Sequence, residues 1–189
     1  LSSAASDVYK RQGTYSYATD AHYMGTKSLK MVKTNQTGWM TARQDVTLPK
    51  GQAYTFSAFF QTLADTVAQL RVTYKNSDGD EVAVDSLPQC SKGEWERMSV
   101  SFSLPADSAS DSATVRLMAG GGAGTVWFDC AQLEAGEVAN RYNMLTNGDF
   151  TFNCGAHPTG WSKNSSNTSE DMVLSLIHIS EPTRLALIS

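Results

Sequence analysis

Apolar and polar residues alternate with a period of two along much of the chain, and the spacing of an amphipathic helix is hard to find in its interior. The clearest case is residues 54–62, where Tyr54, Phe56, Ala58 and Phe60 share one side of an extended strand. Further strands are predicted from the same pattern at residues 28–32, 40–48, 70–75, 82–85, 98–104, 114–119 and 125–133. The pattern therefore predicts about eight half-buried antiparallel strands.

Residues with turn chemistry separate the predicted strands. An Asp-Gly pair within residues 76–80 favours a hairpin, residues 48–51 contain a Pro/Gly turn, and residues 120–124 form a glycine-rich loop. No Lys-Ser/Thr pair follows these glycines, as a phosphate-binding loop requires, so we interpret the loop as a hairpin turn. Short antiparallel strands at this spacing predict an all-β fold, an antiparallel β-sandwich of the jelly-roll type.

Composition excludes several classes of protein. The chain has 189 residues, with 15 Lys and Arg against 19 Asp and Glu, and a net charge of −4. Its basic residues are scattered and form no stripe along which a phosphate backbone would bind, so no nucleic-acid partner is expected. No apolar run approaches the ~20 residues that cross a bilayer, so membrane insertion is not expected. The cysteines, Cys90, Cys130 and Cys154, are far apart and outside any C-x-x-C pattern, which argues against a disulfide framework or a zinc site.

Both ends of the chain have an unusual origin. Residues 2–12 match, codon by codon, a transposase-type sequencing-library adapter, and residues 174–184 match its mosaic end in reverse complement followed by the opposite adapter. We therefore expect residues 1–12 and 174–189 to be non-native and the chain to be a fragment assembled from short metagenomic reads. The remaining residues, 13–173, suffice for one good core and a remainder too short for a second domain.

The alternation stops after Leu133, and a group of motifs around this point resembles, in order, the CenC-like carbohydrate-binding modules. Residues 25–30 (GTKSLK) resemble the family's G-x-x-S-L strand, and residues 93–102 (GEWERMSVSF) resemble its G-x-W-x-R strand. Residues 125–134 (TVWFDCAQLE) resemble the family's last strand, and residues 143–150 (NMLTNGDF) resemble its first strand. The string WFDCAQLEAGEVANRYN is also similar to repeat-rich surface proteins of gut Gram-positive bacteria, in which such modules occur in tandem.

The resemblance implies a division into modules. Residues 13–135 form a first module that lacks the family's N-G-x-F opening strand, and residues 136–142 form a linker. Residues 143–173 begin a second, truncated module, in which residues 160–161 resemble the family's G-W pair.

The family's properties define the expected function. The resemblance implies sugar binding on a concave sheet or at loop tips, often with a structural calcium ion, which is the one cofactor expected for the intact module. Asp129 matches the acidic position of the family's last strand and is the candidate metal ligand. The expected partner is a polysaccharide or cell-surface glycan, and the expected location is secreted or cell-surface, although no signal peptide is visible. Each module is expected to be monomeric within a multidomain chain.

A sugar site needs flat aromatic faces that stack on pyranose rings, and polar groups that bind hydroxyls. Trp39, beside Gly38 in a polar stretch, is either a loop-tip platform or a core residue at a strand edge. Tyr23 lies near it in sequence and is a further candidate. Phe59 faces away from its core neighbours, with Gln61 on the same side, so it is either a ligand contact or a cross-strand packing partner.

Arginines and the remaining tryptophans complete the set of candidates. Arg71, Arg97 and Arg116 point away from the apolar faces of their strands. Their side chains are either solvated at the surface or in contact with sugar hydroxyls. Of these, Arg71 and Arg116 are taken as candidate ligand contacts. Trp95 and Trp127 coincide with framework positions of the family, so a structural role is expected for both.

Catalysis has little support in the sequence. Only His22 and His157 are histidines outside the adapter-like ends, and neither a G-x-S-x-G nor an H-E-x-x-H pattern occurs. The leading hypothesis is a non-catalytic glycan-binding module of a larger secreted or cell-surface protein. The alternatives are a structural spacer or adhesion repeat without a sugar site, in a surface or phage-tail-like protein, and an accessory module of a glycoside hydrolase.

Overall fold

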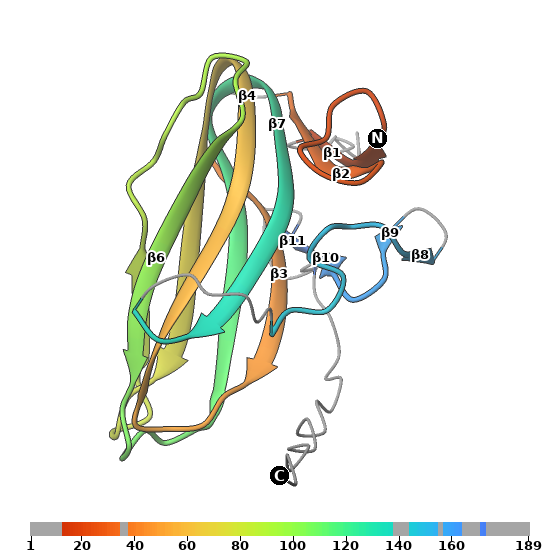
Figure 1. Cartoon of the computed structure of the whole chain (residues 1–189). Helices are drawn as coiled ribbons and strands as arrows, with labels where there is room; N and C mark the ends of the chain where they lie inside the picture. The colour runs from red at the N-terminus through yellow and green to blue at the C-terminus, as the bar shows by residue number, and fades with distance from the viewer. Residues whose placement is uncertain (1–12, 35–37, 138–143, 155–156, 164–170, 173–189) are drawn as a thin grey trace, which may run out of the picture.

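The computed structural model of the chain describes residues 13–34, 38–137, 144–154, 157–163 and 171–172. All regular elements within these ranges are β-strands (Figure 1), and none of the described residues form a helix that could cross a membrane. In chain order the strands are β1 (Gly13–Ala18), β2 (Ser28–Lys33), β3 (Met40–Thr47), β4 (Gln52–Lys75), β5 (Glu81–Asp85), β6 (Glu96–Leu104), β7 (Ser112–Ala135), β8 (Asn153–Cys154), β9 (His157–Pro158), β10 (Ser162–Lys163) and β11 (Asp171–Met172).

Two strands of 24 residues, β4 and β7, form the frame of the fold and pair antiparallel along almost their whole length. Both bend near the top of Figure 1, and each returns in the other layer of the sandwich. Layer A consists of β6, residues 52–63 of β4, residues 124–135 of β7, β2 and β1, in this order. Layer B consists of β5, residues 66–75 of β4, residues 112–121 of β7 and β3, and both β10 and β11 pair with β3.

The bend between the layers depends on glycines and a shift in strand register. The pairing of β4 with β7 shifts between Ala64 and Thr66, and Ala64 has a φ of 60°. On the partner strand Gly121 has a φ of 71°, and a Cβ on it would lie 2.5 Å from the carbonyl oxygen of Asp65. The predicted hairpin turn at residues 120–124 is therefore wrong. These glycines lie within one continuous strand at the point where it changes layers, which is also why the alternation breaks there.

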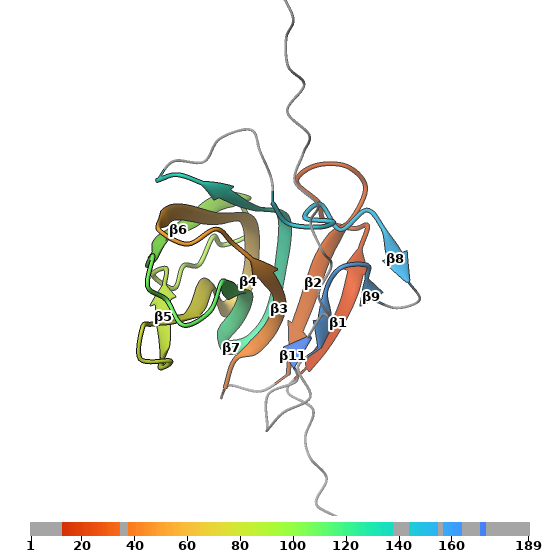
Figure 2. The ribbon, with the colours of Figure 1, turned by 90° about the horizontal axis from the view of Figure 1, so that it is seen from below.

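The core lies between the two layers, as the alternation predicted. Tyr54, Phe56, Ala58 and Phe60 are all fully buried, and each such large side chain contributes roughly 1.5–3 kcal/mol through the apolar surface that it removes from water. They pack with apolar residues of β2, β3, β6 and β7 in a single cluster. The prediction of an all-β antiparallel sandwich is confirmed. Figure 2 shows its layers from below, with β1 and β2 on the same side as β8 and β9.

The described residues between 144 and 161 pack against this same core. Three of their side chains belong to the buried cluster: Leu145, Phe150 and Trp161. The backbone N–H of Met144 donates to the carbonyl oxygen of Leu133 at 2.7 Å, and Nε2 of Gln44 donates to the carbonyl oxygen of Gly160 at 2.7 Å. The segment is therefore joined to the sandwich by both apolar packing and hydrogen bonds.

Several predictions about chain organisation remain predictions. The segments predicted to be adapter-derived, residues 1–12 and 174–189, lie outside the described residues, as does most of the predicted linker at residues 136–142. The division into a module at residues 13–135 and a second one at residues 143–173 also stays a prediction, and the described part of the second segment packs on the first.

Candidate functional site

The residues predicted to contact a ligand lie on the two outer faces of the sandwich. The layer-B face is the outer surface of layer B, made by Trp39, Thr41, Arg43, Gln69, Arg71, Arg116 and Met118. The layer-A face is the surface outside layer A, made by Tyr23, Phe59, Gln61, Trp95 and Arg97. The predicted candidates are thus divided equally between two faces, and each face also contains residues that were not predicted to bind a ligand.

Trp39 lies flat on the surface of layer B. It precedes Met40, whose side chain is fully buried in the core, so the indole points outward. Three adjacent atoms of its six-membered ring, Cε3, Cζ3 and Cη2, lie 2.5–2.6 Å from the place that a Cβ on Gly120 would take. A point nearly equidistant from three adjacent ring atoms lies over the face of the ring and not beside its edge. The indole therefore rests face-on against the backbone of Gly120, where any larger residue would displace it.

Three arginines stand side by side in directly paired register on neighbouring strands of layer B: Arg43 on β3, Arg116 on β7 and Arg71 on β4. Asp85 of β5 ends the row, and Arg71 donates two hydrogen bonds to it, of 2.6 and 2.8 Å. These bonds lower the pKa of Asp85 and raise the pKa of Arg71. Nη1 of Arg116 donates to Oγ1 of Thr73 at 2.7 Å, whereas Nε of Arg43 is buried without an acceptor among the described residues.

A row of mixed polarity separates Trp39 from the arginines. Thr41, Met118 and Gln69 are paired in register across three strands, and all are largely buried. Trp39 and Arg43 lie four residues apart on one extended segment, which corresponds to ~13 Å. A ligand that touches both must therefore be longer than a single sugar ring.

An aromatic cluster forms the layer-A face. Tyr23 stacks face to face on Phe59, with ring centroids 3.7 Å apart and planes inclined by 12°. Trp95 lies 6.1 Å from Tyr23 at an angle of 57°, and the guanidinium carbon of Arg97 lies 5.7 Å from the centroid of Phe59. Tyr23 keeps 45% of its surface exposed, so it is the most accessible aromatic ring of the cluster.

Two polar side chains hold the loops of the layer-A face. Gln61 donates from Nε2 to the carbonyl oxygen of Gly93, so its amide fastens the loop that carries Trp95. Asp129 is fully buried, and its carboxylate accepts the backbone N–H groups of Tyr23 at 2.7 Å, the following residue at 2.9 Å and its own neighbour in sequence at 2.7 Å. Burial raises the pKa of Asp129, and the three backbone hydrogen bonds act against this shift. Asp129 therefore holds Tyr23 over the aromatic ring beneath it.

The same contacts bear on the predicted calcium ion at Asp129. Calcium binds roughly six to eight oxygen ligands, most of them from carboxylates, carbonyls and water. Both carboxylate oxygens of Asp129 already accept N–H groups, and in the described part of the chain no three His, Cys, Asp or Glu side chains gather as a metal site. The described residues do not fit a calcium ion there, and calcium in an intact module stays a prediction.

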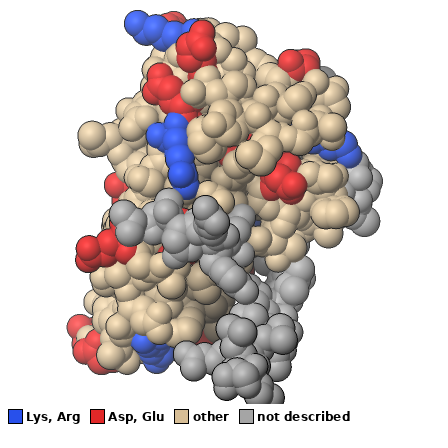
Figure 3. Space-filling view, in the orientation of Figure 1, with Lys and Arg blue, Asp and Glu red and all other residues tan. Residues whose placement is uncertain are grey.

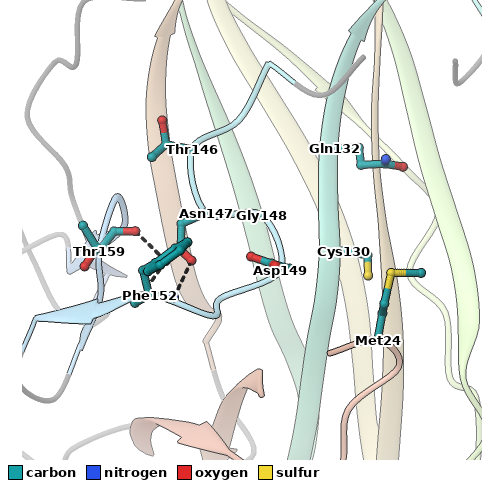
Figure 4. Close-up of a pocket in the computed structure, with 9 residues that line it drawn as sticks. All are labelled: Met24, Cys130, Gln132, Thr146, Asn147, Gly148, Asp149, Phe152 and Thr159. Atoms are coloured by element: carbon teal, nitrogen blue, oxygen red, sulfur yellow. Dashed lines mark hydrogen bonds between the residues drawn. The ribbon is translucent and has the colours of Figure 1, made fainter. Parts of the chain in front are cut away.

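A pocket of about 480 Å³ opens between the sandwich and the segment 144–161 (Figure 4). Met24 and Cys130 line its sandwich side, and the side chain of Asn147, which hydrogen-bonds the backbone of Phe152, lines the other. Burial raises the pKa of Cys130 to about 12, so its thiol stays protonated and is a poor nucleophile at neutral pH. The sequence could not reveal this pocket, because its walls come from segments that are distant along the chain.

The charged side chains visible in Figure 3 include both signs, scattered over that face of the molecule. Among the described residues seen there, Lys and Arg form no continuous stripe. That distribution agrees with the modest net charge of −4.

Comparison with known proteins gives matches at three levels. A family model described as "Carbohydrate binding domain" matches residues 7–123. Among curated proteins, the chain is 28% identical over 155 residues to the tRNA(Glu)-specific nuclease WapA of Bacillus subtilis subsp. natto (strain BEST195), covering 75% of this chain and 7% of that protein. It is also 28% identical over 140 residues to the tRNA nuclease WapA of Bacillus subtilis (strain 168), covering 67% of this chain and 6% of that protein. The chain thus spans less than a tenth of these relatives.

Solved structures share the fold. One is a family 16 carbohydrate-binding module, with a TM-score of 0.52, 22% identity, and coverage of 64% of this chain and 84% of that one. Another is the CBM22-1 xylan-binding domain of Paenibacillus barcinonensis Xyn10C, with a TM-score of 0.55, 15% identity, and coverage of 67% and 83%. The tailspike protein 4 of bacteriophage CBA120 has a TM-score of 0.53 at 9% identity, covering 65% of this chain and 18% of that one.

Proposed function

Because the chain belongs to the carbohydrate-binding domain family whose model spans residues 7–123, we propose that it binds glycan chains through the layer-B face, with Trp39 as the stacking platform. Its family makes it a non-catalytic glycan-binding module, so any catalysis would come from other parts of a parent protein. The observation that carries the proposal is the flat seat of Trp39 on Gly120.

The layer-B face combines the two features that sugar recognition needs. The indole of Trp39 is held parallel to the sheet surface, in the orientation in which an aromatic ring stacks on the apolar face of a pyranose. The guanidinium groups of Arg43 and Arg116 lie on the same face and donate hydrogen bonds only, which suits the oxygen atoms of a sugar chain. The ~13 Å between the platform and the arginine row favours an oligosaccharide over a monosaccharide.

The layer-A face is the competing location. Its candidate Phe59 is covered on one side by Tyr23, with ring centroids 3.7 Å apart, and the amide nitrogen of Gln61 is engaged with the backbone of Gly93, so both are less available to a ligand. Tyr23 remains accessible, and a sugar site there would depend on its ring and on Trp95. A site on the layer-B face predicts that Trp39→Ala weakens glycan binding and Tyr23→Ala does not, and a site on the layer-A face predicts the reverse.

Affinity gel electrophoresis against a panel of soluble polysaccharides, followed by titration calorimetry on those that bind, tests the proposal. Trp39→Ala is expected to weaken binding at least about tenfold, since truncation of a central aromatic contact costs roughly 2 kcal/mol or more. Tyr23→Ala removes a partly exposed aromatic side chain from the opposite face and serves as the control, with an affinity within about twofold of wild type. Thermal unfolding of both variants verifies that they fold.

Three outcomes decide between the possibilities. Loss of binding in Tyr23→Ala with retention in Trp39→Ala would move the site to the layer-A face. Failure of the folded wild-type chain to bind any polysaccharide would overturn the glycan-binding site and favour a spacer or adhesion repeat. Loss in Trp39→Ala alone supports the layer-B site.

The wider context is part of the same proposal. We propose that the module is CenC-like, that it stands in series with similar modules, and that it keeps a larger secreted or cell-surface protein close to a glycan. The family match, the resemblance of residues 143–150 to an opening strand, and the small share of the curated relatives that the chain spans support this. Detection of the source protein in cell-wall or culture-medium fractions tests the location.

A further inference from the structure

We propose that the layer-B face selects glycans that carry oxyanions, such as the carboxylates of uronic acids, through its row of arginines. This inference rests on the proposed function, because it names the class of ligand for the same face. Its basis is a feature that a neutral sugar chain does not require, namely three guanidinium groups in register on adjacent strands.

Repulsion between the positive charges of the arginine row lowers the stability of the fold when no anion lies close to them. Arg116 is paired directly with Arg43 on one side and with Arg71 on the other, and like charges directly opposite each other on a sheet are destabilising. Asp85 relieves this most strongly at the Arg71 end, where Arg71 donates to both of its carboxylate oxygens, and it attracts Arg116 more weakly. An oxyanion placed at the other end would relieve the repulsion in the same way.

Two more carboxylates lie on this side of layer B, namely Glu81 on β5, which attracts Arg71, and Asp45 on β3. Asp45 lies two residues after Arg43 on β3, and its Oδ1 accepts the hydroxyl of Thr114 at 2.6 Å. Nε of Arg43 is buried and has no acceptor among the described residues. A guanidinium offers five donors in a planar fork that matches a carboxylate or a phosphate ester with two parallel hydrogen bonds. Arg43 and its neighbour Arg116 are thus the groups that an oxyanion would bind.

Trp39 explains why the ligand is an acidic glycan and not an arbitrary polyanion. The backbone of Trp39 lies ~13 Å from that of Arg43 along the extended segment that leads into β3, so one ligand chain that contacts both side chains must combine sugar faces with anionic groups. The chain as a whole carries a net charge of −4, which disfavours long polyanions that offer charge alone.

The test compares binding of the whole chain to polygalacturonate, its fully methyl-esterified form, a teichoic acid whose repeat contains a hexose phosphate, and a single-stranded oligonucleotide of similar charge. Wild type is expected to bind at least one of the two acidic glycans about tenfold more tightly than the ester, because a charge-assisted hydrogen bond is replaced by a neutral one. Which of the two binds more tightly identifies the oxyanion as carboxylate or phosphate.

Arg43→Gln and Arg116→Gln are expected to remove this preference, because they should weaken binding of the acidic glycan about tenfold more than binding of the ester. Arg43→Lys keeps the charge but loses the planar fork, so it should retain only part of the preference. Lys92→Gln, which removes one exposed cation from a loop beside the layer-A face, is the control and should behave like wild type.

The possible failures are distinguishable. Equal or tighter binding to the ester would overturn the inference and leave the proposed function intact. Binding to the oligonucleotide as tight as to the acidic glycans would also overturn it, by showing attraction to charge alone. No binding to any glycan by the folded chain would overturn the proposed function and this inference together.

Discussion

Replacement of Trp161 by alanine gives the sharpest test of how the segment 144–161 is joined to the sandwich. The indole is 2% exposed, and its ring centroid lies 5.3 Å from that of Phe150 within the shared core. Its Nε1 donates to two backbone carbonyl oxygens, those of Thr146 and Asn147, each at an N···O distance of 3.2 Å. Trp161→Ala therefore removes a large buried ring and the donor that satisfies the backbone of its own segment.

The expected loss of stability follows from burial. Truncation of a buried tryptophan to alanine costs about 3–5 kcal/mol in the free energy of unfolding, because transfer and cavity terms add. For a chain of this size, 1 kcal/mol lowers the midpoint of thermal unfolding by about 2–4 °C, so the midpoint should fall by about 10 °C. Phe152→Ala is the matched control, since Phe152 belongs to the same segment but is 69% exposed, and it should change stability by less than about 0.5 kcal/mol.

Urea unfolding followed by far-ultraviolet circular dichroism measures both variants. One cooperative core predicts a single unfolding transition in each variant, with its urea midpoint lowered in Trp161→Ala and unchanged in Phe152→Ala. A wild-type midpoint in Trp161→Ala would refute the reasoning, because it would mean that residues 144–161 do not stabilise the sandwich. That result would favour the alternative in which they belong only to a separate following module.

Three further predictions concern individual side chains. Gly120→Val should displace the ring of Trp39, lowering the stability measured by urea unfolding by about 1–3 kcal/mol and weakening glycan binding in gel retardation; unchanged binding would contradict the flat seat. Asp129→Ala should leave three backbone N–H groups without their acceptor and cost about 1–3 kcal/mol in the same unfolding assay, and a wild-type midpoint would show that the loop is held otherwise. In iodoacetamide labelling at pH 8, the exposed Cys90 should react at least tenfold faster than Cys130, whose pKa of about 12 keeps it protonated; equal rates by mass spectrometry would contradict this.

The sequence predicted the fold well wherever one face of a strand meets the core. Phe56 and Phe60 are buried, as their alternation indicates, because one face of each strand packs against the hydrophobic core. The continuity of β4 and β7 was missed, since a strand that changes layers loses its alternation at the bend, and the glycines there resemble those of a turn. The packing of Trp161 depends on contacts between distant segments, which local patterns do not encode.

The candidate site was predicted in part. Trp39, Arg71 and Arg116 do lie on one face, because outward positions on paired strands of a layer meet there. Arg43 occupies an equivalent outward position on β3, and its alternation with Ala42 and Gln44 was the signal that could have identified it. Whether a candidate is open to a ligand depends on which loop covers it, and that depends on contacts that the sequence does not show.

The central claim is that glycan binds over Trp39 on the layer-B face, and the most direct measurement is a titration followed by two-dimensional ¹H–¹⁵N NMR. The chain has four tryptophans, whose indole Nε1–H signals can be assigned by single Trp→Phe substitutions. Addition of a polysaccharide fragment that binds should shift the signal of Trp39 and the Nε–H signals of the arginine row, with the signal of Trp95 unchanged. Shifts confined to Trp95, with Trp39 and the arginines unmoved, would contradict the account.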